Sequence, residues 1–206
     1  MRGIFPCLCA VLLALLAAAS QDRGHHPEAS TALRMDLTQL VAGADLVLEG
    51  RVVSTTALVA ADGLVHTEIQ LLVERTYWGE HLGVRTLRLP GGVLPDGHGT
   101  LVPGMPQLAT GQDVVLVLSP ETHLGSRVVC GLAQGHYSLL RDVRGRRLAV
   151  RWQADATLDP DAHLGALVPG GVGAAEVLEY AELVARLESA VAARSAREEA
   201  AHGEGR

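Results

Sequence analysis

The most regular pattern in the chain is an alternation of apolar and polar residues over Val65–Trp78. A period of two is typical of a β-strand with one buried face. Residues 45–56 form an earlier run rich in apolar and β-branched side chains, and Asp62-Gly63 lies between the two runs. The pattern therefore predicts a long β-hairpin. The buried face of its second strand is expected to carry Val65, Thr67, Ile69, Leu71, Val73 and Tyr77, and the solvent face His66, Glu68, Gln70, Glu74 and Thr76.

Shorter apolar runs follow, each bounded by turn-forming residues. They predict strands over residues 84–89, 113–118, 127–131, 136–141 and 147–152. The run at 114–118 is unbroken, which is typical of a strand covered on both faces. The last two strands flank Asp142-Val143-Arg144-Gly145, where glycine suits the turn position that needs a positive φ. Many short strands separated by turns predict a mainly β domain, either a barrel or a sandwich.

Helical spacing of apolar residues appears at both ends of this β region. It predicts a short helix over residues 32–42 and a long helix starting at Ala174. The long helix has two interpretations: it docks on the β domain, or it forms a two-heptad coiled-coil dimer. Two heptads are short for a coiled coil, which favours docking. Its apolar stripe is expected to consist of Val177, Tyr180, Val184, Leu187 and Val191.

The first residues have the pattern of an export signal. Arg2 precedes an apolar stretch that ends in Ala17-Ala18-Ala19, so residues 1–19 are predicted to be a cleaved signal peptide. The alternative is a retained membrane anchor, but this stretch is shorter than the roughly 20 residues that span a bilayer. The protein is therefore expected to be periplasmic or extracellular. We expect a flexible arm over 20–31, a β-barrel domain with its N-terminal helix over 32–169, and the C-terminal helix and tail over 170–206.

Composition narrows the possible cores and partners. Aromatic residues make up 3% of the chain and the single phenylalanine, Phe5, lies in the leader, so valine, leucine and alanine must form the core. The net charge of −6 disfavours nucleic acid and anionic membrane as partners. Once the leader is removed, Cys130 is the single cysteine, so no intramolecular disulfide is expected. Cys130 is predicted to be a small buried apolar residue, with pairing between chains as the alternative.

No local motif for catalysis, metal or cofactor binding is present. The chain lacks Gly-x-Ser-x-Gly, His-x-x-x-His and paired cysteines, so no catalytic residue, metal ligand or cofactor is predicted. The most unusual segment is 90–111, which holds six glycines and four prolines. Loops of this length are uncommon and are usually functional or disordered. Its centre, Asp96-Gly97-His98-Gly99, suits either a close approach to a ligand or ordinary turns.

Arginines at positions 141, 144, 146, 147 and 151 gather around the last predicted hairpin. They could hold phosphate, sulfated glycan or carboxylates through the forked guanidinium, or they could simply be solvated. The candidate partner-binding residues are Asp96, His98 and Met105 in the loop and Arg144, Arg146 and Arg147 in the hairpin.

A set of short motifs over residues 37–152 resembles a family of uncharacterised exported bacterial proteins. The motifs are residues 44–52, Thr67, Trp78-Gly79-Glu80, Pro90-Gly91-Gly92, residues 111–116, Gly131 and Gln134-Gly135. The resemblance implies a small OB-like barrel, closed or partly open, similar to netrin-type modules and tissue metalloprotease inhibitors. The short N-terminal helix and the long C-terminal helix predicted from their apolar spacing complete the expected fold. Those inhibitors reach the target's metal with an N-terminal cysteine. The mature chain lacks one, so their mechanism is not carried over.

Three functions remain open at this level. The first is a non-catalytic exported module that contacts a protein or peptide partner through the 90–111 loop. The second is a secreted hydrolase whose site is assembled from dispersed residues such as His66, Glu68 and His98. The third is a structural envelope protein that oligomerises through the C-terminal helix.

Overall fold

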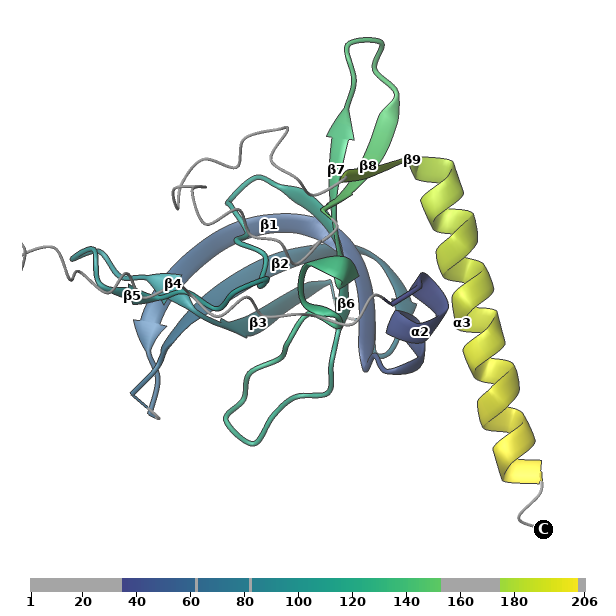
Figure 1. The fold of residues 1–206 in the computed structure, drawn as a ribbon, viewed down its shortest axis with the longest axis horizontal. Helices are drawn as coiled ribbons and strands as arrows, with labels where there is room; N and C mark the ends of the chain where they lie inside the picture. The colour runs from purple at the N-terminus through teal and green to yellow at the C-terminus, as the bar shows by residue number, and fades with distance from the viewer. Residues whose placement is uncertain (1–34, 62, 82, 153–174, 204–206) are drawn as a thin grey trace, which may run out of the picture.

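The computed structural model describes residues 35–61, 63–81, 83–152 and 175–203. The predicted leader, the arm and residues 153–169 lie outside this part of the chain. The fold is mainly β, with one seven-stranded antiparallel sheet in the order β3-β2-β1-β6-β7-β8-β9 and a small β4–β5 hairpin (Figure 1). The elements are α2 (Leu37–Ala42), β1 (Leu46–Val59), β2 (Val65–Trp78), β3 (Val84–Pro90), β4 (Gly92–Val93), β5 (Gly99–Thr100), β6 (Asp113–Leu118), the 3₁₀ turn η1 (Leu132–Gly135), β7 (His136–Arg141), β8 (Arg147–Trp152), β9 (Ala175–Glu179) and α3 (Tyr180–Gly203).

The long hairpin predicted from the alternation is confirmed as β1–β2. Its strands pair from Val59↔Val65 to Val47↔Trp78 and curve strongly along their length (Figure 1). The register shifts at three points, and such bulges bend a strand pair and increase its twist. Gly50 permits the close approach of the two strands, because a Cβ at this position would fall onto the carbonyl oxygen of Leu72.

The bulges also change which face Tyr77 occupies. Ile69, Leu71 and Val73 are buried together as predicted. Tyr77, expected beside them, instead packs with the core on the other face of the sheet. The register skips Glu74, which precedes Tyr77, and one skipped residue reverses the alternation that follows it. A second correction concerns His66, which was expected to face solvent and is 3% exposed.

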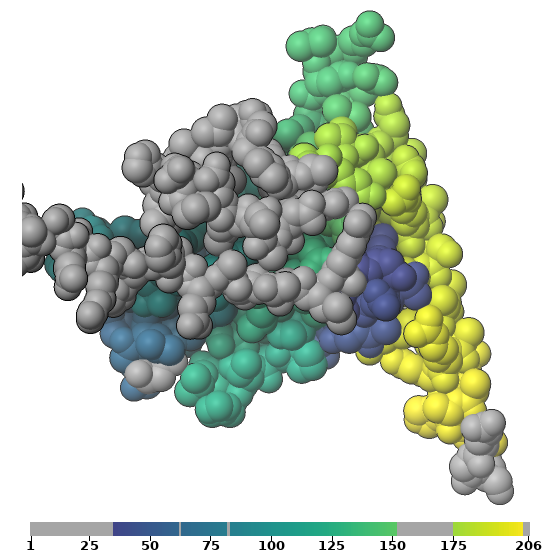
Figure 2. All heavy atoms as spheres, viewed as in Figure 1, coloured from purple at the N-terminus to yellow at the C-terminus, as the bar shows by residue number. Residues whose placement is uncertain are grey.

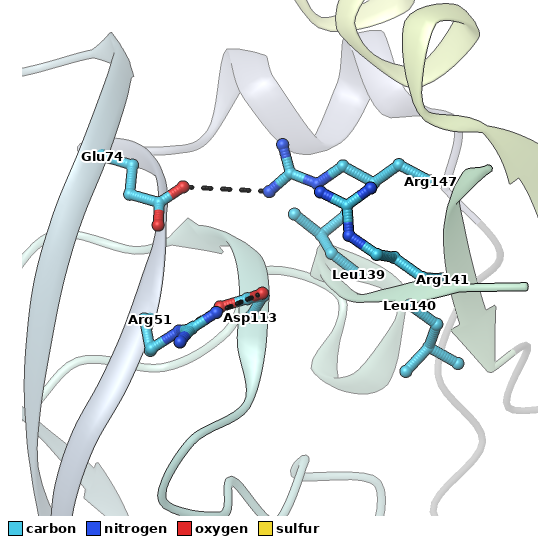
Figure 3. Close-up of a pocket in the computed structure, with 7 residues that line it drawn as sticks. All are labelled: Arg51, Glu74, Asp113, Leu139, Leu140, Arg141 and Arg147. Atoms are coloured by element: carbon cyan, nitrogen blue, oxygen red, sulfur yellow. Dashed lines mark hydrogen bonds and ion pairs between the residues drawn. The ribbon is translucent and has the colours of Figure 1, made fainter. Parts of the chain in front are cut away.

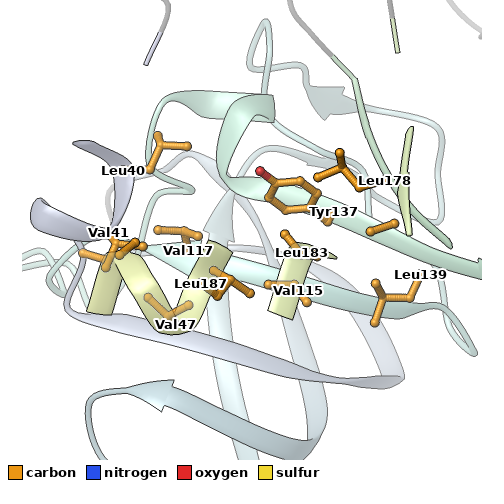
Figure 4. Close-up of a cluster of buried hydrophobic side chains, with 13 residues drawn as sticks. Leu40, Val41, Val47, Val115, Val117, Tyr137, Leu139, Leu178, Leu183 and Leu187 are labelled. Carbon is orange, nitrogen blue, oxygen red and sulfur yellow. The ribbon is translucent and has the colours of Figure 1, made fainter. Parts of the chain in front are cut away.

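The sheet separates two apolar cores, and β6 contributes to both. Val115 and Val117 face one core, whereas Val114, Leu116 and Leu118 face the other, so the prediction of a strand covered on both faces is confirmed. Figure 4 shows the first core, where Leu183 and Leu187 of α3 lie over β6.

The two helices cover one face of the sheet side by side. α2 begins after Asp36, whose carboxylate accepts the backbone N–H of Gln39 at 2.8 Å in a capping box. α3 docks through Leu183, Leu187 and Ala190, which are buried, so the docking interpretation holds within the single chain.

The predicted start of the C-terminal helix at Ala174 is wrong. Ala175–Glu179 form strand β9 on the edge of β8, and helix α3 begins at Tyr180. Val177, expected in the helical stripe, is exposed on this strand. The local helical spacing is overridden because pairing with β8 satisfies the backbone of β9 and buries Leu178.

The strand predicted over 127–131 is also wrong. Only Val129 forms an isolated bridge, to Leu118, and the chain then turns into η1. Gly131 adopts a left-handed conformation with φ +62°, which ends any extended run. Cys130 precedes it as a half-buried free thiol against the first core, and burial raises its pKa.

The 90–111 segment is partly ordered by the β4–β5 hairpin, which packs on β2. Gly92 makes this possible, because a Cβ there would fall onto the Thr67 hydroxyl. Pairing among the described residues leaves β3 and β9 as the sheet edges, so the sheet is open. In the part of the chain that the structure describes, neither helix has the length and apolar character needed to cross a bilayer.

His136, at the start of β7, is a buried titratable group. The residue is 5% exposed, and burial lowers the pKa of its imidazole to about 4. Within the described residues, its Nε2 has no hydrogen-bond partner. The folded chain therefore holds this ring in its neutral form well below the usual histidine pKa.

Acidification from pH 7 to pH 5 is expected to lower the free energy of unfolding by about 2 kcal/mol through this histidine. The unfolded chain binds the proton near pH 6.5 and the folded chain only near pH 4. The stability contributed by neutral His136 is therefore complete above pH 6.5 and is lost as the pH falls toward 4. Urea denaturation at both pH values measures it. His136→Gln should remove most of this difference, whereas His98→Gln, in an exposed turn, should keep it. If both variants show the same change in the free energy of unfolding between the two pH values, the change does not come from His136.

Candidate ligand-binding site

The sheet face beneath α3 changes from apolar to polar along its strands. On β1, Val47 lies in the core, followed on the same face by Glu49 and then Arg51. On β6, Val115 pairs with Glu49, and Asp113 pairs with Arg51. Helix α3 covers the apolar part, and its first residue, Tyr180, bonds to Glu49 at the boundary, so this helix does not cover the polar part of the face.

An open pocket of about 210 Å³ occupies this polar end of the face (Figure 3). Five strands of the sheet, β1, β2, β6, β7 and β8, supply its walls, and its charged lining consists of three arginines and two acids. The lining residues are Arg51, Glu74, Asp113, Leu139, Leu140, Arg141 and Arg147.

Arg141 and Arg147 lie directly opposite each other on β7 and β8. Like charges in this arrangement are destabilising. Arg147 is compensated, since its Nη2 lies 2.9 Å from Glu49 and 3.8 Å from Glu74. The Arg141 guanidinium donates to the carbonyl oxygen of Gly145 at 3.2 Å, and no carboxylate of the described chain lies within ion-pair distance of it. Arg141 therefore keeps donors available for a ligand in the pocket.

The third arginine of the lining, Arg51, is already paired with an acid of the pocket wall. Arg51 forms a two-point contact with Asp113, at 2.7 Å from Nε and 3.0 Å from Nη2. The hydrogen bond from Arg51 lowers the pKa of Asp113, and the charges of Arg147 and Arg141 lower it further against the opposing effect of desolvation. Asp113 is thus held as a carboxylate on the pocket wall.

A buried carboxylate fixes the position of Arg147. Glu49 is 2% exposed and accepts hydrogen bonds from the hydroxyls of Tyr77 at 2.8 Å and Tyr180 at 2.9 Å. The Arg147 guanidinium also lies over the Tyr180 ring, 4.0 Å from its centroid. Burial and the bond to Glu49 raise the pKa of both tyrosines, so both remain protonated donors. This network joins β1, β2, β8 and α3 and holds one guanidinium at the pocket.

The arginines predicted to bind a partner have three different roles. Arg147 lines the pocket, but Arg146 points elsewhere and pairs with Asp142 at 2.8 Å and Glu179 at 2.9 Å. Arg144 is exposed in the tight turn, where Gly145 has the predicted positive φ. Figure 2 shows this hairpin projecting beyond the rest of the molecule.

The predicted loop residues lie elsewhere. Figure 1 shows the β4–β5 and β7–β8 hairpins projecting from different ends of the fold. Asp96 accepts the backbone N–H of His98 at 3.0 Å, which is the ordinary-turn interpretation of this motif. Met105 is 9% exposed and belongs to the second core, so its side chain is not displayed to a partner.

The three residues suggested for a hydrolase site, His66, Glu68 and His98, lie in different environments. His66 is buried, Glu68 pairs with Arg88 at 3.1 Å, and His98 lies beside Asp96 in the exposed turn. In the described ranges, no group of three or more His, Cys, Asp or Glu residues is arranged to hold a metal.

The sequence predictions missed most of the pocket. Arg141 was noticed only as one of a cluster, and Arg51, Glu74 and Asp113 were not singled out. One signal was available: Arg141 is the last residue of one predicted strand and Arg147 is the first residue of the next, so a tight hairpin between them brings the two side by side.

Comparisons of the chain with protein-family models, curated proteins and solved structures gave no match. Its function therefore has to be inferred from the geometry of the pocket.

Proposed function

We propose that this chain is a non-catalytic binding module that holds a protein or peptide partner by a carboxylate group in the arginine-lined pocket. The observation that carries this function is the opposed pair Arg141 and Arg147, of which Arg141 has no carboxylate among the described residues. A like-charge pair on a β-ladder costs stability in the absence of an anion. Local features that cost stability are expected chiefly at functional sites.

The chemistry of the pocket suits a carboxylate. A guanidinium presents its N–H groups in a planar fork that matches the two oxygens of a carboxylate. Arg147 is held in place by Glu49 and Tyr180, so little conformational entropy is lost when a ligand binds beside it. The buried side chain of Leu139 supplies an apolar wall.

The 90–111 loop is proposed as a second contact surface for the same partner. Val93 and Leu101 are more than half exposed there, which favours contact with another chain. We also propose that the protein is exported, with residues 1–19 as its leader. The strong curvature of β1 and β2 supports an OB-like barrel as the finer description of the fold.

Arg141→Gln is expected to weaken binding of an acidic peptide about tenfold or more, because one charge-assisted hydrogen-bonding group is lost. The probe is a fluorescent, amidated peptide of alternating glutamate and leucine, and anisotropy measures its dissociation constant with the purified chain. The matched control is Arg144→Gln, which removes the same charge from the exposed turn and should change affinity less than about threefold.

Two outcomes would contradict the proposed function. If the unaltered chain does not bind the peptide, the pocket is not a carboxylate site. If both arginine variants weaken binding equally, the attraction is a general charge effect of the hairpin and not recognition in the pocket.

A further inference from the structure

We infer that Glu74 is a specificity-determining residue that makes the pocket select a singly charged carboxylate over a doubly charged phosphoryl group, a selectivity that rests on the proposed function. Glu74 lines the pocket from β2, and Figure 3 shows its carboxylate directed across the space toward Arg147. The gap between Glu74 Oε2 and Arg147 Nη2 is 3.8 Å, and the Glu74 side chain is 45% exposed. Its charge therefore reaches into the pocket.

The ion pairs around the pocket leave one guanidinium without a carboxylate partner among the described residues. Asp113 is already paired with Arg51 through the two-point contact. Arg147 is paired with Glu49, because its Nη2 lies 2.9 Å from Glu49 Oε1, closer than it lies to Glu74 Oε2. The guanidinium that no carboxylate of the described residues reaches is therefore that of Arg141, and one carboxylate pairs it, while the charge of Glu74 stays beside the site.

A phosphoryl group does not fit this balance. It carries about −1.5 to −2 charges at neutral pH, and a phosphate placed next to Asp or Glu is disfavoured by repulsion. Once Arg141 has balanced its first charge, the second would face Glu74 and the occupied Asp113 across a small pocket. A carboxylate avoids this repulsion, so the acidic side chains of the lining select a ligand with one negative charge over a ligand with two.

The position of Glu74 is set by the fold. It is the residue skipped between the pairs Gly50↔Val73 and Arg75↔Glu49, so a bulge in β2 places it at the rim of the pocket. Bulges recur beside binding sites because they redirect a side chain without ending the strand pair. Glu74→Gln keeps the shape of the side chain and removes its charge, which makes it the appropriate test.

The experiment compares three amidated peptides that differ at one position, which is glutamate, phosphoserine or sulfoserine. Sulfoserine has the tetrahedral shape of phosphoserine with a single charge, so it separates size from charge. The unaltered chain should bind the phosphoserine peptide about three- to tenfold more weakly than the other two. Glu74→Gln should reduce this difference to less than about twofold, whereas Glu188→Gln, at an exposed acid on α3, should leave it unchanged.

The outcomes separate this inference from the proposed function. Failure of all three peptides to bind would overturn the proposed function itself. Binding of the glutamate peptide with equal binding of phosphoserine would overturn the selectivity alone. A sulfoserine peptide as weak as phosphoserine would show that size and not charge is selected, and would also overturn it. A thermal melt of Glu74→Gln that matches that of the unaltered chain shows that the variant is folded.

Discussion

Replacing Glu49 with alanine is expected to lower the free energy of unfolding by about 3–5 kcal/mol. Glu49 is 2% exposed and is the shared partner of Tyr77, Tyr180 and Arg147. Its removal leaves a guanidinium and two hydroxyls without their acceptor. Losing one member of a buried, hydrogen-bonded pair costs more than the pair contributes, since the remaining groups stay desolvated. Urea denaturation followed by circular dichroism measures the change.

Two variants control this experiment. Tyr180→Phe removes one donor and keeps the ring beneath Arg147, so about 1 kcal/mol should be lost. Glu188→Ala removes an exposed acid that lies 3.7 Å from Arg75, and the change should be below about 0.5 kcal/mol. A loss in Glu49→Ala no larger than that in Glu188→Ala would show that the network does not stabilise the fold.

Glu49→Ala should also weaken binding of the acidic peptide. Arg147 would lose its closest carboxylate and with it the fixed orientation at the pocket. The loss should appear under conditions in which the variant remains folded, which distinguishes positioning of Arg147 from a general loss of stability.

Leu187→Ala is the second change with a large expected effect, a loss of about 2–5 kcal/mol. Leu187 is fully buried where α3 packs on the first core, and Figure 4 shows it beside Val47 and Val115. Alanine removes apolar contacts and leaves a cavity that the surrounding sheet only partly fills. Val143→Ala, at the exposed hairpin tip, is the control and should change stability by less than about 0.5 kcal/mol.

The concentration dependence of this effect tests the oligomer hypothesis. If α3 docks on its own sheet, the melting temperatures of the unaltered chain and of Leu187→Ala should not change with protein concentration. If the helix formed a coiled-coil dimer, both melting temperatures would rise with concentration. Analytical ultracentrifugation at the same concentrations gives an independent reading.

Local sequence patterns were sufficient for most of the secondary structure. The limits of β2 were visible in its alternation, and the sites of β6, β7 and β8 in short apolar runs. Gly145 was correctly placed in a tight turn, since a positive φ is a property of one residue and its neighbours. These features depend on side-chain period and turn chemistry, which act over a few residues.

Predictions failed where long-range pairing competed with local preference. Ala175–Glu179 follow a helical pattern, yet they extend β8 because an open strand edge satisfies their backbone. Tyr77 changed face because the bulge at Glu74 shifts the register of β2 against β1. This bulge is not marked by the residues that form it, since it arises from fitting one curved strand to another.

The sequence by itself determined the mainly β class, the positions of most strands and the turn between β7 and β8. Only the tertiary structure decided the pocket. Glu49 and Tyr180 are 131 residues apart, and Arg51 meets Asp113 through the pairing of β1 with β6. The strands are determined largely by interactions between near neighbours, whereas the site depends on register, bulges and helix docking. These are settled by burial and backbone pairing across the whole chain.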